Sequence, residues 1–232
     1  MAIIINIDTS SNFCSVALAI DGEIVVGLES AQKMDHSTSL APFVEKCFES
    51  LRERGEKLDA ISVVTGPGSY TGLRIGLSLA KGIAFGQDIP LICVSSLEVM
   101  AVRGIFSYHD FQGDEIIIPM MDAGRMEVYT GIYDSALHPV QEESALILEE
   151  KSFSDLPDDT KILFIGDGTE KFKELFKKEN AVWLGAGMPH AKYMAALSEK
   201  YYREKKFSDV AYTVPRYLKE YKATKPKNMI LK

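Results

Sequence analysis

The chain opens with short apolar runs separated by turn residues. Three of these runs have the β-branched and apolar content of strands: residues 3–7, 14–20 and 23–29. Asp21 and Gly22, between the last two runs, predict a two-residue hairpin turn. Residues 37–54 then carry apolar side chains at helical spacing, which predicts an amphipathic helix with Pro42 in its first turn.

A glycine-rich turn follows the next apolar run. Residues 59–65 predict a buried parallel strand, and residues 66–76 read GPGSYTGLRIG. Ser69 or Thr71 can cap the first amides of the helix that follows. A nucleotide P-loop needs Gly-Lys-Ser/Thr at the end of the turn, and a serine-hydrolase elbow needs glycine where Pro67 stands, so the sequence excludes both. An anion site and a simple tight turn between strand and helix remain the alternatives.

The helix predicted at residues 72–86 is more apolar than packing on one sheet requires. Its only charged or hydroxyl side chains, Arg74, Ser78 and Lys81, fall on one narrow stripe. The wide apolar arc predicts a second covering surface, either a neighbouring helix of the same chain or a partner protein. Close approach of another backbone is expected along small residues spaced four apart, namely Gly72, Gly76 and Ala80.

Strands and helices alternate through the rest of the chain. The predicted strands are residues 90–94, 115–121, 128–133, 145–148 and 161–165, and the predicted helices are residues 96–106, 169–178 and 192–205. A polar loop at 108–113 separates two units. We therefore expect an N-terminal domain at residues 1–106 and a smaller C-terminal domain at residues 107–232, whose last helix is a candidate to pack back on the first domain.

Composition narrows the function classes. A formal net charge of −7 over 232 residues argues against a protein that binds nucleic acid by itself through a broad basic surface. The three cysteines are far apart in apolar segments, which indicates a reducing, cytoplasmic environment, and no signal peptide or transmembrane run is found.

A solvated C-terminus is predicted from Lys219, Lys222, Lys225, Lys227 and Lys232. No metal site is predicted, because the histidines are scattered at His36, His109, His138 and His190.

Several short motifs together resemble the TsaB (YeaZ) family. They are residues 7–10 (IDTS), 14–18 (CSVAL), 36–37 (HS), 66–76 (GPGSYTGLRIG), 94–97 (VSSL), 121–125 (MDAGR), 166–168 (GDG) and 215–218 (PRYL). The resemblance implies an α/β protein with a two-lobed actin-like fold of the sugar-kinase and Hsp70 class, in which both lobes are ribonuclease H-like.

The resemblance also implies a function. TsaB-like proteins are regarded as non-catalytic scaffold subunits in the synthesis of threonylcarbamoyladenosine in the anticodon loop of tRNA. The implied partners are a catalytic TsaD-like paralogue, a TsaE-like ATPase, a second copy of the chain when the paralogue is absent, and tRNA only through the complex. In the paralogue a His-x-x-x-His pair binds the metal, and Ser96 and Met100 stand at those places here. We therefore expect no metal and no catalysis by this chain alone.

Two sets of residues are candidates for binding. The apolar arcs of the helices at 37–54 and 72–86 predict partner contacts by Leu40, Phe43, Val44, Cys47, Leu73, Arg74, Leu77, Lys81 and Phe85. Phosphate-binding turns of actin-like folds correspond to Asp8, Thr9, Ser10, Gly166, Asp167 and Gly168. The second set either forms a vestigial nucleotide site or only starts a turn and caps a helix. No cofactor is required in this interpretation, and weak binding of ATP or ADP with magnesium stays open.

An enzyme is the alternative of a different class. A small ATPase or phosphotransferase of the sugar-kinase-like superfamily would place Asp8 near the metal-bound phosphate and use residues 166–168 as the second phosphate turn. It would turn over ATP with magnesium without any partner.

Overall fold

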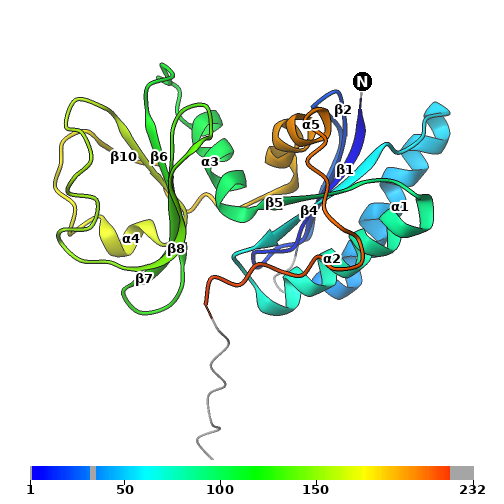
Figure 1. Ribbon diagram of the computed structural model, residues 1–232, viewed down its shortest axis with the longest axis horizontal. Coiled ribbons are helices and arrows are strands. Elements are labelled where there is room, and N and C mark those ends of the chain that lie inside the picture. Colours follow the sequence, from blue (N-terminus) through cyan, green and yellow to red (C-terminus); the bar gives the residue numbers. More distant parts are fainter. Residues whose placement is uncertain (1, 32–34, 220–232) are drawn as a thin grey trace, which may run out of the picture.

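The computed structural model describes residues 2–31 and 35–219. Within this part the chain forms two lobes, each built on a five-stranded sheet, which lie side by side in Figure 1. The predicted solvated lysines beyond Lys219 lie outside the described residues: Lys222, Lys225, Lys227 and Lys232.

The first sheet combines an antiparallel meander with two parallel strands. Its strands are β1 (Ile3–Asp8), β2 (Ser15–Ile20), β3 (Glu23–Glu29), β4 (Ala60–Gly66) and β5 (Leu91–Ser95), in the order β3-β2-β1-β4-β5. β1, β2 and β3 pair antiparallel, whereas β4 runs parallel to β1 and β5. Asp21 and Gly22 have φ values of 51° and 81°, as the predicted hairpin turn between β2 and β3 requires.

The second sheet repeats the first. Its strands are β6 (Ile116–Asp122), β7 (Glu127–Tyr133), β8 (Pro139–Ile147), β9 (Ile162–Ile165) and β10 (Ala181–Trp183). Read from the β8 edge the order is β8-β7-β6-β9-β10, with the same antiparallel and parallel pairings as the first sheet. The predicted two-lobed, actin-like α/β fold with ribonuclease H-like lobes is therefore confirmed.

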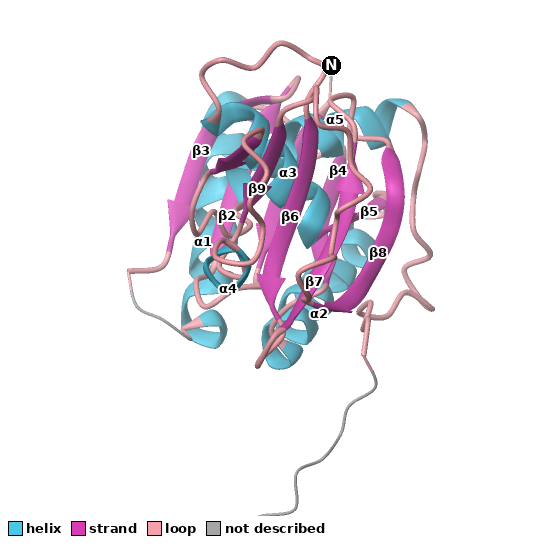
Figure 2. Ribbon diagram, turned by 90° about the vertical axis from the view of Figure 1, so that its left-hand side faces the viewer, coloured by secondary structure: helices cyan, strands magenta, loops and turns pink. Residues whose placement is uncertain are grey.

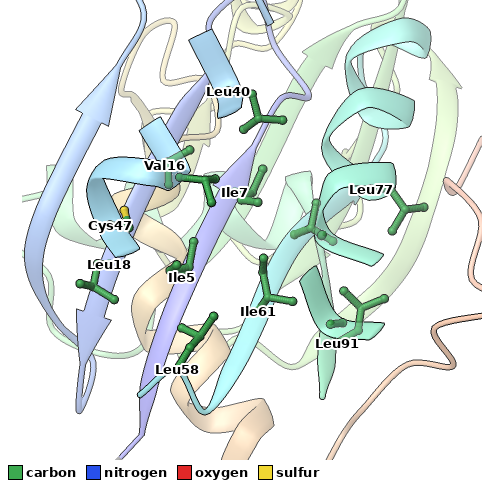
Figure 3. Packing of buried hydrophobic residues seen from close by; sticks show 14 of the residues in the cluster. Ile5, Ile7, Val16, Leu18, Leu40, Cys47, Leu58, Ile61, Leu77 and Leu91 are labelled. Carbon is green, nitrogen blue, oxygen red and sulfur yellow. The ribbon is translucent and has the colours of Figure 1, made fainter. Parts of the chain in front are cut away.

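Two helices cover the outer face of the first sheet. α1 (His36–Arg54) and α2 (Tyr70–Gln87) pack side by side on it in Figures 1 and 2. Figure 3 shows the core beneath them, a single buried cluster to which the alternate positions Ile5 and Ile7 of β1 and Leu77 of α2 belong. Burial of one such side chain contributes about 1.5 to 3 kcal/mol, so this layer fixes both helices on the sheet.

A helix also lies between the sheets. α3 (Ser96–Ser107) packs Val99 against the inner face of the first sheet and Leu97 against the second. Ser95 and Glu98 form a capping box at its start. The 3-10 turn η1 (Ala191–Met194) and α5 (Ala195–Arg203) pack on the same inner face of the first sheet, although they follow the second in the chain.

Several predicted elements differ from the structure. The helix predicted at 169–178 ends early, as α4 (Thr169–Phe172), because Phe172 and Phe176 turn into an aromatic cluster with Phe164 and Trp183. The predicted strand at 145–148 is the end of the longer β8, the short β10 was not predicted, and the predicted helix at 192–205 begins as η1. Pro42 lies inside α1 rather than in its first turn, on the exposed side.

After α5 the chain stays on the first lobe and runs along α2. We call residues 208–219 the C-terminal strap, drawn from orange to red in Figure 1. The Ser208 amide donates to the Leu91 carbonyl over 2.8 Å, and the Arg216 amide donates to the Thr65 carbonyl over 2.8 Å. Among the helices of the described ranges, none is long and apolar enough to cross a membrane.

Candidate functional site

The apolar side chains of α1 and α2 pack mainly against other parts of their own chain. Leu40, Val44 and Cys47 of α1 and Leu73 and Leu77 of α2 are buried in the first lobe. These five side chains, predicted to contact a partner, therefore pack in the core of their own lobe, and partner contact by them stays a prediction. The helical spacing correctly identified an apolar arc, but the buried sector of that arc faces β1 and β4 rather than solvent.

The other predicted partner residues remain at the surface. Phe43 is half-buried beside the core, and Phe85 is 83% exposed. Arg74 donates to the Tyr217 hydroxyl over 3.0 Å, and Lys81 donates to carbonyls of the C-terminal strap. Only Phe85 among them is an exposed large apolar side chain, so it is the strongest candidate anchor for a partner.

A second set of α2 residues, which lies in the predicted apolar arc but not among the predicted partner residues, completes the surface. Ile75, Leu79 and Ile83 are half-buried, and small residues are exposed between them and Phe85. We call this surface the helix face: Thr71, Ile75, Ser78, Leu79, Gly82, Ile83, Phe85 and Gly86. No atom lies within 4 Å of a Cβ built at Gly82 or Gly86, so another backbone can approach closely there.

Gly72 and Gly76, at the start of α2, allow close packing inside the chain rather than on a partner. A Cβ built on Gly72 would lie 2.1 Å from the Thr9 carbonyl oxygen, and one on Gly76 would lie 2.3 Å from Thr9 Oγ1. The backbone predicted to approach this ridge is therefore the turn after β1 of the same chain. Ser69 caps the helix as predicted, because its Oγ accepts from the Gly72 amide over 3.2 Å.

The first candidate phosphate turn is closed by this packing. Asp8, Thr9 and Ser10 are buried. Thr9 donates to the Gly72 carbonyl over 2.8 Å, and Asp8 Oδ1 accepts from the amide and hydroxyl of Ser10 over 2.9 and 2.6 Å. A Cβ on Gly68 would lie 2.3 Å from the Ser10 carbonyl oxygen. A phosphate binds to open backbone amides, and the Ser10 amide of this turn is already bonded to Asp8.

The second candidate phosphate turn, residues 166–168, also packs against its own lobe. Cβ atoms built on Gly166 and Gly168 would lie 2.2 and 2.9 Å from the Met120 carbonyl oxygen. Asp167 accepts from the Asp122 amide over 2.8 Å and does not cap α4, so the predicted capping role is wrong. The glycines thus allow close packing of the turn on β6.

Burial perturbs the carboxyl group of Asp8. Loss of water around it raises the pKa of Asp8 above 3.8, more than the hydrogen bonds from Ser10 and the charge of His36 lower it. Within residues 2–31 and 35–219, its Oδ2 atom has no hydrogen-bond partner. Because the folded chain holds this proton to a higher pH than the unfolded chain, the free energy of unfolding falls as pH rises from about 3.8 to the folded pKa.

Replacement of this carboxyl by an amide tests that interpretation. Asp8→Asn keeps the Oδ1 acceptor for Ser10 and carries no charge. We expect its free energy of unfolding at pH 7 to exceed that of the wild type. The expected gain is about 1.4 kcal/mol for each unit by which folding raises the pKa of Asp8. Urea unfolding at pH 4.5 and 7 measures this, and the exposed Asp110→Asn is the control. A variant that is less stable than the wild type at pH 7 would contradict it.

A polar cavity of about 500 Å³ opens between the lobes, and its lining includes neither residues 8–10 nor residues 166–168. Its walls include the β7–β8 hairpin, the first turn of α3, α5 and the strap. The buried Glu143 carboxylate accepts from the hydroxyls of Ser95 and Tyr133 and pairs with Arg216 over 2.7 Å. Desolvation raises the pKa of Glu143. Its oxygens are used within the chain, so this network ties the strap to the second lobe.

Ser96 and Met100, which the family resemblance aligned with the metal-binding histidines expected in the paralogue, are packed in the core. Ser96 is buried and donates to the Pro67 carbonyl, and buried Met100 packs against Gly166. Over residues 2–31 and 35–219, no three His, Cys, Asp or Glu side chains are grouped as metal ligands. A hydroxyl in a hydrogen bond and a thioether in a core are poor ligands for a divalent cation of the zinc or magnesium type.

Comparison with known proteins places the chain in a family. The sequence model described as TsaD, tRNA N6-adenosine threonylcarbamoyltransferase, matches residues 29–227. The tRNA threonylcarbamoyladenosine biosynthesis protein TsaB of Bacillus subtilis is 32% identical over 221 residues, which cover 93% of each chain. A tRNA N6-adenosine threonylcarbamoyltransferase of Thermus thermophilus is 31% identical over 110 residues, 41% of this chain and 34% of that protein.

Solved structures agree with the sequence relatives. YeaZ from Pseudomonas aeruginosa superposes with a TM-score of 0.76 at 27% identity, and the match covers 94% of this chain and all of that one. The repeated sheet topology, the motif at 66–76 and these similarities converge. The chain belongs to the TsaB (YeaZ) family, as its sequence motifs predicted.

Proposed function

We propose that this chain is a non-catalytic scaffold subunit in the biosynthesis of threonylcarbamoyladenosine in tRNA, and that it pairs with a TsaD-like catalytic subunit. The observation that carries the proposal is the helix face, which exposes small and apolar side chains on a rigid helix of the family's most specific motif. The buried turn at Asp8, Thr9 and Ser10 supports a role without nucleotide chemistry.

Relatedness to TsaD favours a particular geometry of pairing. The TsaD sequence model spans both α1 and α2, so a TsaD-like subunit carries an equivalent pair of helices. Two related subunits can place equivalent faces against each other about a pseudo-twofold axis. The open positions at Gly82 and Gly86 favour close contact of the two α2 helices.

The remaining partners follow from the resemblance and the surface. The same helix face supports pairing of two copies when the TsaD-like subunit is absent. The formal charge of −7 supports tRNA contact only through the complex. A TsaE-like ATPase is the further proposed partner, and the cytoplasm is the proposed location.

Reconstitution tests the proposal. The purified chain, a TsaD-like protein and tRNA are mixed with a source of threonylcarbamoyl-adenylate, and the modified adenosine in the tRNA is quantified. We expect formation of the product to depend on both proteins. Equal product without this chain would contradict the scaffold role.

The same samples test the ATPase alternative, in which Asp8 and residues 166–168 hold the phosphates. We propose that the chain requires no cofactor, and we expect no magnesium-dependent ATP turnover from the chain alone. Turnover that disappears in Asp8→Ala would overturn this proposal and favour the phosphotransferase interpretation.

A further inference from the structure

The C-terminal strap has a fixed backbone. The Asp209 carboxylate accepts from the amides of Ala211 and Tyr212 over 2.7 and 2.9 Å, which closes a turn. Lys81 of α2 donates to the carbonyls of Ala211 and Thr213 over 3.1 and 3.0 Å. These hydrogen bonds hold the segment on α2 without a partner, which lowers the entropy cost of using it as a binding surface.

This fixed segment presents apolar side chains to solvent. Tyr212 is 84% exposed and Val214 is 71% exposed, although an apolar side chain gains from burial. Lys81 bonds the carbonyls on either side of Tyr212 and lies one helical turn before Phe85. Tyr212 and Val214 of the strap and Phe85 of α2 are thus exposed apolar side chains on two segments that Lys81 joins, and exposed apolar surfaces mark binding sites.

The helix face alone is too small for a stable complex. α2 has 18 residues, so it is about 27 Å long, and a stripe about 10 Å wide on it offers roughly 270 Å². A standard interface buries about 800 Å² on each partner. On the far side, α1 exposes charged residues such as Glu45, Lys46 and Glu49, which suit a polar rim. The strap is the apolar surface that adjoins α2 on its other side.

We propose that the C-terminal strap is part of the docking surface for the TsaD-like subunit, with Tyr212 and Val214 as anchors beside Phe85. The inference rests on the proposed function, because it takes its occupant from the pairing proposed for the helix face, which lies on the helix that Lys81 joins to the strap. The area needed for a stable interface supports it. Aromatic side chains held rigidly near the centre of an interface commonly dominate the binding energy.

Equilibrium titration with a purified TsaD-like protein tests the inference. The test variant carries Tyr212→Ser with Val214→Ser, and the matched control carries Phe106→Ser with Val140→Ser. The control side chains are 69% and 61% exposed, on α3 and β8, away from the helix face. We expect the strap variant to bind at least tenfold more weakly and the control to bind within twofold of the wild type. Thermal unfolding verifies that all variants fold.

A third variant, Phe85→Ser, separates this inference from the proposed function. If Phe85→Ser weakens binding and the strap variant does not, the inference is wrong and the pairing through the helix face stands. If neither weakens binding, both are wrong. If the strap variant alters only the association of two copies in a sizing experiment, with unchanged affinity for the TsaD-like protein, the inference is also wrong.

Discussion

Replacement of Gly72 by alanine is expected to destabilise the protein by about 3 kcal/mol. The added methyl carbon would lie 2.1 Å from the Thr9 carbonyl oxygen and 2.8 Å from Cδ2 of His36. Because the Thr9 contact is with backbone, relief requires α2 to move away from β1. That movement would lengthen the hydrogen bond from Thr9 to the Gly72 carbonyl and loosen the core around Leu73.

A second glycine on the same helix provides the matched control. A Cβ at Gly82 has no atom within 4 Å. Gly82→Ala is therefore expected to stabilise the protein by about 0.5 to 1 kcal/mol, through the higher helix propensity of alanine. Urea unfolding of both variants measures the difference. A Gly72→Ala protein within about 0.5 kcal/mol of the wild type would show that the turn after β1 is not held against α2 as described.

The strand and helix pattern was largely predictable because its signals are local. Apolar runs in β1 and β2 and the Asp21–Gly22 turn specify the hairpin whatever the rest of the chain does. α4 shows where local signals fail. The helix was predicted to continue beyond Phe172, but Phe176 packs instead on Phe164 of β9 and Trp183 of β10, which the pattern within residues 169–178 does not reveal.

The candidate site was less predictable because its geometry is set by contacts distant in sequence. An arc that is apolar nearly all round does not reveal which sector faces the sheet, so the predicted partner residues included the buried Leu77 and left out the half-buried Ile75 of the same arc. Gly72 suits an approaching backbone, but only the fold shows that Thr9 supplies it. The strap carries no periodic signal, since it is held on α2 through backbone carbonyls that accept from Lys81.

The second large effect is expected at the centre of the helix face. Ser78 is exposed on α2, so Ser78→Arg leaves the core of the first lobe unchanged. In a complex through this face the guanidinium would be buried without a partner and would hold the two α2 helices apart. We expect affinity for the TsaD-like subunit to fall at least 100-fold, which corresponds to about 2.7 kcal/mol. Ser107→Arg, on an exposed serine at the end of α3, is the matched control.

The most direct test of the scaffold role is a titration of the TsaD-like subunit with wild type, Ser78→Arg and Ser107→Arg. The account predicts saturable binding by the wild type and by Ser107→Arg, and a loss of binding by Ser78→Arg with an unchanged thermal midpoint. Equal affinities of all three proteins would contradict it, because the subunit would then bind somewhere other than the helix face.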